Sequence, residues 1–191
     1  MCGICGYLNF ESQNSADAHV LQAMGDQLRH RGPDESGYHL DGPCALMNLR
    51  LSILDLQSGR QPIHNEDQSV WVIQNGEIYN FQELRAELVR AGHRFYTRCD
   101  TEVLVHLYET YGSDFVRKLD GMFALALWDA RQKRLLLARD PAGKKPLFYH
   151  QNHGAFVFAS EIKALLVHPG ITRELDFERL PELFAYGYVP S

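Results

Sequence analysis

The amino-acid sequence predicts a layered α+β domain, and two patterns carry this prediction. Strand-like runs occur in adjacent pairs joined by short turns, which favours antiparallel pairing, and helical stretches are inserted between the pairs. The strands beside the turns are apolar at nearly every residue, as in "GMFALALW", so both faces of each sheet need a cover. We therefore expect sheets stacked on each other with helices outside.

The individual elements follow from local composition. Strands are expected where β-forming apolar residues lie between turn residues, at 3–9, 36–40, 44–54, 69–79, 121–139, 147–150 and 155–159. Helices are expected where apolar residues repeat at helical spacing, at 16–32, 81–91, 101–111, 161–167 and 176–187. A polar stretch over 56–68 is expected to be a loop.

Three local signals sharpen these boundaries. Asn75 and Gly76, set between apolar β-formers, predict a two-residue hairpin turn. Asn80 and Glu83 have the spacing of a capping box at the start of the 81–91 helix. Asp100 lies where the N-cap of the next helix belongs.

Composition bounds the function. The chain has 191 residues, which suits one domain, and its net charge of -5 argues against a nucleic-acid partner held by phosphate contacts. Its apolar runs are too short to span a bilayer, and the first residues do not resemble a secretory signal, so we expect a cytoplasmic protein with no membrane partner. In that compartment the four cysteines are expected to be free thiols.

The opening "MCGIC" places Cys2 directly after the initiator methionine and three residues before Cys5. A zinc site needs about four ligands, but the chain has no second C-x-x-C and no H-x-x-x-H pair, so no metal is expected. A redox pair and a pair of buried thiols are the other interpretations of this spacing. Removal of Met1 would give Cys2 a free α-amine with a pKa of roughly 7.7–8.0, a usable base beside a thiol nucleophile.

Nine motifs in order identify a family. They are "MCGICGY", "RHRGPDESG", "RLSILDL", "QPIHNED", "NGEIYN", "DTEVLVHLYETYG", "GMFALALWD", "RDPAGKKPLFY" and "ASEIKAL". Together they resemble the glutaminase domain of class II glutamine amidotransferases, in the branch of glutamine-hydrolysing asparagine synthetases. The resemblance implies the N-terminal-nucleophile hydrolase fold, a four-layer αββα sandwich of two antiparallel sheets between helices.

The resemblance also implies roles for individual residues. Cys2 would attack the side-chain amide of glutamine, and the Asn75 amide and the Gly76 backbone N–H would form the oxyanion hole. Arg50 would clamp the α-carboxylate of glutamine, a task that suits its planar guanidinium. The α-ammonium group of glutamine would bind the carboxylates of Glu77 and Asp100. Arg31 and Gly32 match a loop that orders over this site in the family.

The family implies a partner as well. Residues 1–185 are expected to form the glutaminase domain, and residues 186–191 to begin a linker to an ATP-dependent synthetase domain or subunit absent from this chain. ATP and Mg would belong to that synthetase, so no cofactor is expected here. The ammonia would serve asparagine synthesis from aspartate, or a different amidation or cyclisation; a non-catalytic docking module is the remaining alternative. A homodimer is possible.

Overall fold

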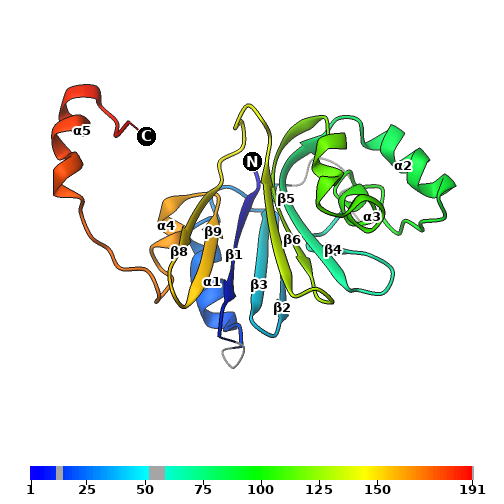
Figure 1. Cartoon of the computed structure of the whole chain (residues 1–191), viewed down its shortest axis with the longest axis horizontal. Helices are drawn as coiled ribbons and strands as arrows, with labels where there is room; N and C mark the ends of the chain where they lie inside the picture. Colours follow the sequence, from blue (N-terminus) through cyan, green and yellow to red (C-terminus); the bar gives the residue numbers. More distant parts are fainter. Residues whose placement is uncertain (12–14, 52–58, 191) are drawn as a thin grey trace.

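The computed structural model describes residues 1–11, 15–51 and 59–190, and Figure 1 shows two sheets flanked by helices. Sheet A has the strand order β2-β3-β1-β9-β8, and sheet B has the order β4-β5-β6-β7. The strands of sheet A are β1 (Gly3–Asn9), β2 (Glu35–Asp41), β3 (Cys44–Arg50), β8 (Phe148–Gln151) and β9 (Ala155–Ala159). Those of sheet B are β4 (Ile63–His64), β5 (Val70–Ile78), β6 (Gly121–Asp129) and β7 (Arg134–Arg139).

Helices cover the outer face of each sheet, and one further helical segment near the C-terminal end lies apart from both sheets. They are α1 (Ala18–Asp26), α2 (Phe81–Arg90), α3 (Glu102–Tyr111), α4 (Ile162–Leu165) and α5 (Leu180–Tyr186), with short 3-10 helices η1 (Gly112–Lys118) and η2 (Phe177–Arg179). Both α2 and α3 end at a glycine with positive φ, Gly92 and Gly112, as their sequences predict. No helix within the described ranges is long and apolar enough to cross a membrane.

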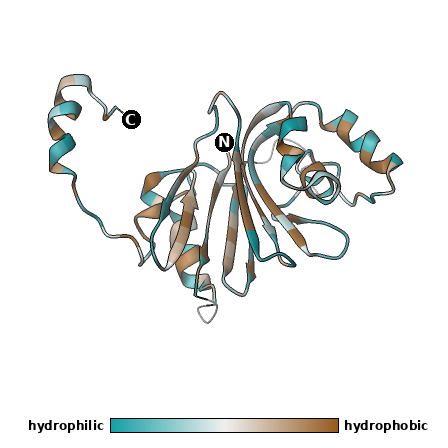
Figure 2. Cartoon of the chain, in the orientation of Figure 1, coloured by the Kyte–Doolittle hydropathy of each residue, from teal (hydrophilic) through white to brown (hydrophobic). Residues whose placement is uncertain are grey.

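Three apolar cores hold the layers together. The middle core lies between the sheets and joins Ile4 and Phe158 of sheet A to Ile73 and Trp128 of sheet B. The second core packs α1 and α4 on sheet A, and the third packs α2 and α3 on sheet B. In Figure 2 the strands carry mostly apolar colours, whereas the helices alternate between apolar and polar. The structure therefore has the expected αββα layers, with antiparallel pairing at every strand contact recorded.

Three local predictions were wrong, and the third, which concerns Asp100, is described with the site. Asn75 and Gly76 do not form a hairpin turn but lie inside β5, opposite Ala124 and Phe123 of β6. Asn80 occupies the N-cap position of α2, but its side chain makes no capping bond and instead joins the backbone of Lys118 and that of Asp120.

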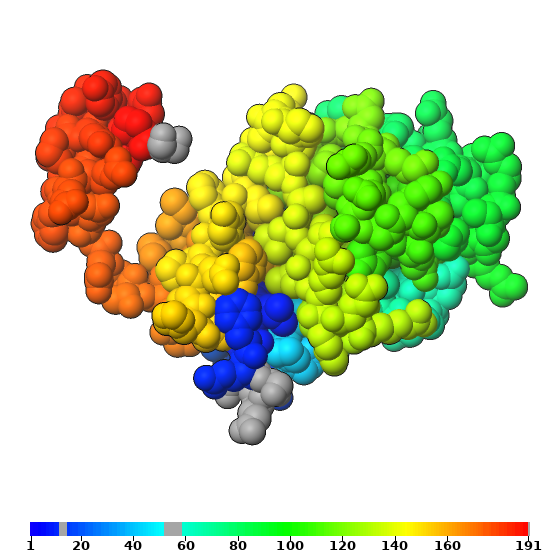
Figure 3. Space-filling model, in the orientation of Figure 1, coloured from blue at the N-terminus to red at the C-terminus, as the bar shows by residue number. Residues whose placement is uncertain are grey.

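The C-terminal segment lies apart from the sheets. After α4 the chain runs outward to η2 and α5, which stand beside the body of the domain in Figures 1 and 3. Apolar residues of this segment are exposed, including Phe177 at 73% and Phe184 at 84%.

Candidate active site

A small cavity of about 40 Å³ lies where the ends of several strands meet. It collects five of the six side chains or backbone groups expected from the sequence to act on glutamine. The described residues that line it are Cys2, Arg50, Leu51, Gln61, Gly76, Glu77, Cys99, Asp100 and Thr101. Because these residues come from both sheets and from the start of α3, the cavity exists only in the folded chain.

Cys2 enters this cavity from the end of β1. Its Sγ lies 3.7 Å from the Leu51 carbonyl oxygen and accepts a hydrogen bond from the Leu51 N–H at 3.4 Å. Cys2 is partly exposed, and Met1 before it is 59% exposed. The thiol is therefore accessible, and the residue that must be removed to free its α-amine is accessible too.

Cys2 and Cys5 do not form a functional pair. Residues of a strand alternate between its two faces, and Ile4 faces the middle core while Cys5 faces the core beneath α1. All four cysteines are free thiols. Burial raises the pKa of Cys5 to about 12, which leaves it a protonated, inert core residue.

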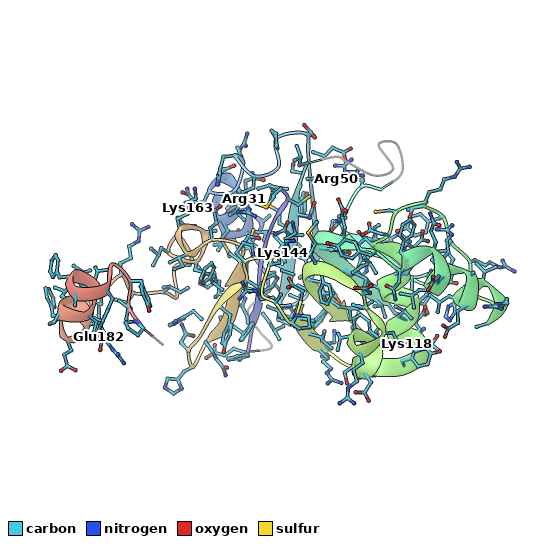
Figure 4. The ribbon with its side chains drawn as sticks, turned by 90° about the horizontal axis from the view of Figure 1, so that it is seen from above. Arg31, Arg50, Lys118, Lys144, Lys163 and Glu182 are labelled. Carbon is cyan, nitrogen blue, oxygen red and sulfur yellow. The ribbon has the colours of Figure 1, made fainter. Side chains whose placement is uncertain are left out.

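The position of Cys2 is set by residues from the far end of the sequence. The Ser160 hydroxyl accepts a hydrogen bond from the Ile4 N–H at 3.0 Å. Arg31 donates from Nε to the Cys2 carbonyl oxygen at 3.0 Å and from Nη1 to Glu161 at 3.0 Å. Arg31 and Lys163 lie side by side in Figure 4, and both contact Glu161. Glu161 thus orients the arginine that holds the backbone of the nucleophile candidate.

The motif "ASEIKAL" contains Ser160 and Glu161, but the sequence did not assign either residue a role. The contact of Ser160 with Ile4 spans 156 positions and that of Glu161 with Arg31 spans 130, so no local spacing reveals them. The glycine at position 32, next to Arg31, is required by the packing of its loop against β3. A Cβ on Gly32 would lie 2.1 Å from the Leu49 carbonyl oxygen, so only glycine lets this loop approach β3.

The ion pair of Glu161 predicts a pH-dependent contribution to stability. Partial burial raises the pKa of Glu161, but hydrogen bonds from Arg31, His30 and Lys163 outweigh it and lower that pKa from 4.5 to about 2. A carboxyl with a lowered pKa stabilises the fold above its unfolded pKa and loses this contribution as the pH falls toward the folded value.

We therefore expect Glu161→Gln to reduce the free energy of unfolding by about 1 kcal/mol at pH 7. The gap between wild type and variant should narrow as the pH falls from about 4.5 toward 2, because the wild-type carboxyl then gains its proton. Urea unfolding of both proteins at several pH values measures this difference in the free energy of unfolding. Glu182→Gln, which removes an exposed ion pair between the end of η2 and α5, is the control and should show a near-zero difference. A gap for Glu161→Gln that widens toward acid pH would contradict the assignment.

Asn75 and Gly76 present the amide groups expected of an oxyanion hole. Asn75 has the same parity as Ile73 in β5, so its side chain faces the middle layer toward sheet A. The Asn75 side chain is 1% exposed, and its Nδ2 has no hydrogen-bond partner among the described residues. A buried amide donor without a partner is costly, and such groups are common where a ligand completes the bond.

Gly76 is required by the backbone at this point. Its φ is 145°, and a Cβ would lie 1.9 Å from the Met122 carbonyl oxygen of the neighbouring strand. The glycine therefore lets β5 pass close to β6 while its backbone borders the cavity beside Cys2.

Charged side chains surround the same cavity. Arg50 is almost completely buried, and its Nη1 donates to Glu35 Oε2 at 2.9 Å, which fixes the plane of the guanidinium. Glu77 is half-buried and lines the cavity from β5. The lining of the cavity therefore contains one cationic side chain, Arg50, and two anionic ones, Glu77 and Asp100. An α-carboxylate and an α-ammonium group need this combination of charges.

Asp100 does not cap α3, whose N-cap residue is Thr101. The Asp100 carboxylate instead accepts hydrogen bonds from the Ile78 N–H at 2.8 Å and from the Gln74 side chain at 3.3 Å. Gln61, which the sequence did not single out, supports the same region. It accepts from the Gln74 N–H at 2.6 Å. These contacts fasten the start of α3 to β5.

Solved structures with the same fold are known. The chain superimposes on glutamine phosphoribosylpyrophosphate amidotransferase from Bacillus subtilis, complexed with ADP and GMP, with a TM-score of 0.72 and 22% identity. The match covers 87% of this chain and 43% of that one. A structure titled as the allosteric regulatory enzyme of purine biosynthesis matches with a TM-score of 0.73, 23% identity and the same coverage. The fold is therefore that of the N-terminal-nucleophile domain of class II amidotransferases.

The sequence comparisons narrow this class to a family. A model of the glutamine amidotransferase domain matches residues 1–191, and the chain belongs to this family. Asparagine synthetase [glutamine-hydrolyzing] 2 of Bacillus subtilis (strain 168) is 44% identical over 100% of this chain and 26% of its own length. Asparagine synthetase [glutamine-hydrolyzing] 2 of Oryza sativa subsp. japonica is 48% identical over 86% of this chain and 28% of its own length. The chain thus spans about a quarter of the length of these curated relatives.

Proposed function

We propose that this chain hydrolyses glutamine to glutamate and ammonia. The observation that carries the proposal is the cavity that gathers Cys2, Gly76 and a set of charged side chains, together with the Asn75 amide, which precedes Gly76 in β5 and has no partner among the described residues. Glutamine has an amide to be cleaved, an α-carboxylate and an α-ammonium group. The cavity contains a matching group for each of them.

The reaction would proceed in two steps after Met1 is removed. The Cys2 thiol loses its proton to its own α-amine and attacks the side-chain amide carbon of glutamine. Asn75 Nδ2 and the Gly76 N–H stabilise the resulting oxyanion. The α-amine passes the proton to the leaving nitrogen, ammonia departs, and a γ-glutamyl thioester remains. Water then attacks the thioester, the thiol regains its proton, and glutamate is released.

The substrate would be oriented by its amino-acid end. Arg50 would bind the α-carboxylate, and its bond to Glu35 would hold the guanidinium in one plane. Glu77 and Asp100 would bind the α-ammonium group. The hydrogen bonds from β5 to Asp100 keep that carboxylate in place before substrate arrives.

The ammonia would be consumed by an ATP-dependent synthetase, because the relatives named above are asparagine synthetases and are about four times longer. In this proposal residues 1–185 form the glutaminase domain, residues 186–191 begin the linker, and aspartate is the acceptor. This chain contributes the ammonia, and the synthetase portion contributes the ATP and Mg chemistry.

The decisive experiment joins an activity assay to intact-mass measurement. We expect glutamate release from glutamine by protein that lacks Met1, and no release by protein in which an N-terminal extension blocks Cys2. Release by the blocked protein would contradict the role of the α-amine. A folded, Met-free protein that stays inactive with the synthetase portion supplied would support a docking module instead.

A further inference from the structure

A second group of reactive side chains lies on the outer layer of sheet B, in the helical layer that covers it (Figure 1). Four residues from three segments take part. Glu66 follows β4, His93 follows α2, and His106 and Glu109 lie one turn apart on α3. One nitrogen or oxygen atom of each residue lies within 4.8 Å of the corresponding atom in the other three.

Three of the six distances between these atoms lie close to the edges of a metal coordination shell, and all six are within 4.8 Å. His106 Nδ1 lies 3.0 Å from Glu109 Oε2 and 3.6 Å from Glu66 Oε2, and His93 Nδ1 lies 3.5 Å from Glu109 Oε2. Tetrahedral zinc with bonds of about 2.0–2.2 Å sets its ligand atoms roughly 3.3–3.6 Å apart. The three pairs therefore need shifts of a few tenths of an ångström at most.

Each carboxylate is held so that one oxygen faces this cluster. Glu109 Oε1 accepts a hydrogen bond from Asn65 Nδ2 at 2.7 Å, which leaves Oε2 toward the two rings. Glu66 Oε1 accepts from the Arg94 N–H at 2.9 Å, and its Oε2 faces His106. Hydrogen bonds to the second oxygen of a ligating carboxylate are a regular feature of metal sites.

Each imidazole is oriented in the same way. His93 Nε2 lies 3.0 Å from the Thr110 hydroxyl, so its Nδ1 faces Glu109. His106 Nε2 faces Oε1 of the fully buried Glu102 at 3.8 Å, the arrangement in which a carboxylate stands behind a ligating histidine. His106 Nε2 is buried and has no hydrogen-bond partner among the residues described, so a small ring shift toward Glu102 would complete that bond.

The cluster is buried on the side of His106 and open to solvent on the side of Glu66. The side chain of His106 is 1% exposed, whereas that of Glu66 is 42% exposed. An ion can therefore enter beside Glu66 and reach a fixed imidazole. Two neutral imidazoles and two carboxylates balance the charge of a divalent cation, and this mixture of nitrogen and oxygen ligands suits zinc.

We propose that Glu66, His93, His106 and Glu109 form a structural Zn²⁺ site. The four protein ligands leave no open coordination position, which separates a structural site from a catalytic one. The ion would tie the loop after β4 and the end of α2 to α3. Thr101, the N-cap residue of α3, and Asp100 before it both line the proposed glutaminase cavity. The zinc site would therefore stabilise the helix that borders this cavity.

The test uses the full chain after treatment with a chelator and dialysis. We expect calorimetric titration with zinc chloride to show one ion per chain, and zinc to raise the melting temperature. Glu66→Gln and His93→Gln should each weaken zinc binding by more than the 10–100-fold that loss of a supporting partner typically costs. Glu66 is exposed, so its variant should fold. His153→Gln removes an exposed histidine outside the cluster and should bind zinc as the wild type does.

Cobalt distinguishes this site from a cysteine site. Co²⁺ bound here should give the visible absorption of tetrahedral coordination without a thiolate charge-transfer band. Three results would overturn the proposal: no stoichiometric zinc binding, zinc binding that survives both substitutions, or a thiolate band. Binding that survives both substitutions, or a thiolate band, would place the ion elsewhere. Absence of stoichiometric binding would mean that the four residues form only an ion-pair cluster. None of them bears on glutamine hydrolysis.

Discussion

Replacing Cys2 with alanine is expected to reduce glutamate release by at least about 10⁴-fold, because the reaction then lacks its nucleophile. The partly exposed thiol lies in the cavity and contributes little to the core, so the variant should unfold at the same urea concentration as the wild type. Initial rates of glutamate release at saturating glutamine measure the loss.

Cys5→Ala is the matched control for this experiment. Cys5 is completely buried beneath α1, so its substitution should lower stability modestly and leave the rate within a few-fold of wild type. A redox couple would require both thiols. Equal loss of activity in the two variants would therefore contradict the single-nucleophile mechanism.

Asn75→Ala is expected to lower kcat by about 10²–10³-fold, which corresponds to about 2.7–4 kcal/mol of transition-state stabilisation. The reason is that Nδ2 of Asn75 would bond the oxyanion and not the ground-state amide, so KM should change little. Steady-state kinetics over a range of glutamine concentrations separate kcat from KM.

Asn48→Ala controls for the loss of a buried amide. Asn48 is also 1% exposed, but its Nδ2 already donates to the Gln74 carbonyl oxygen at 3.1 Å between the sheets. Its substitution should therefore reduce the melting temperature more than kcat. If the two variants lose stability alike and lose kcat alike, Asn75 has no special part in catalysis.

The layers of the fold could be predicted because the apolar patterns are strong. The runs that form β3 and β6 are apolar over nearly their whole length, and both strands are buried on two faces. The Asn75-Gly76 prediction failed because that dipeptide favours a tight turn in isolation. Here β6 pairs with all nine residues of β5, and the close approach of Met122 accounts for the glycine.

The candidate site was predictable only in part. The motifs singled out Cys2, Arg50 and Asp100, because each lies in a recognisable stretch of sequence, and the three residues line one cavity in the structure. The contact of Glu161 with Arg31 spans 130 positions, and in the proposed zinc site β5 and α2 lie between Glu66 and His93, while His106 and Glu109 follow on α3. Contacts of this kind depend on tertiary packing, and local spacing does not report them.

The pairing of β1 with β9 has a consequence for folding during synthesis of the polypeptide on the ribosome. Residues 3–9 leave the ribosome well before their partner strand, Ala155–Ala159, and Ser160 closes the contact with Ile4. Pairing across such a long loop must wait for most of the domain to be synthesised. A nascent chain consequently has the Cys2 thiol long before it has the cavity around that thiol.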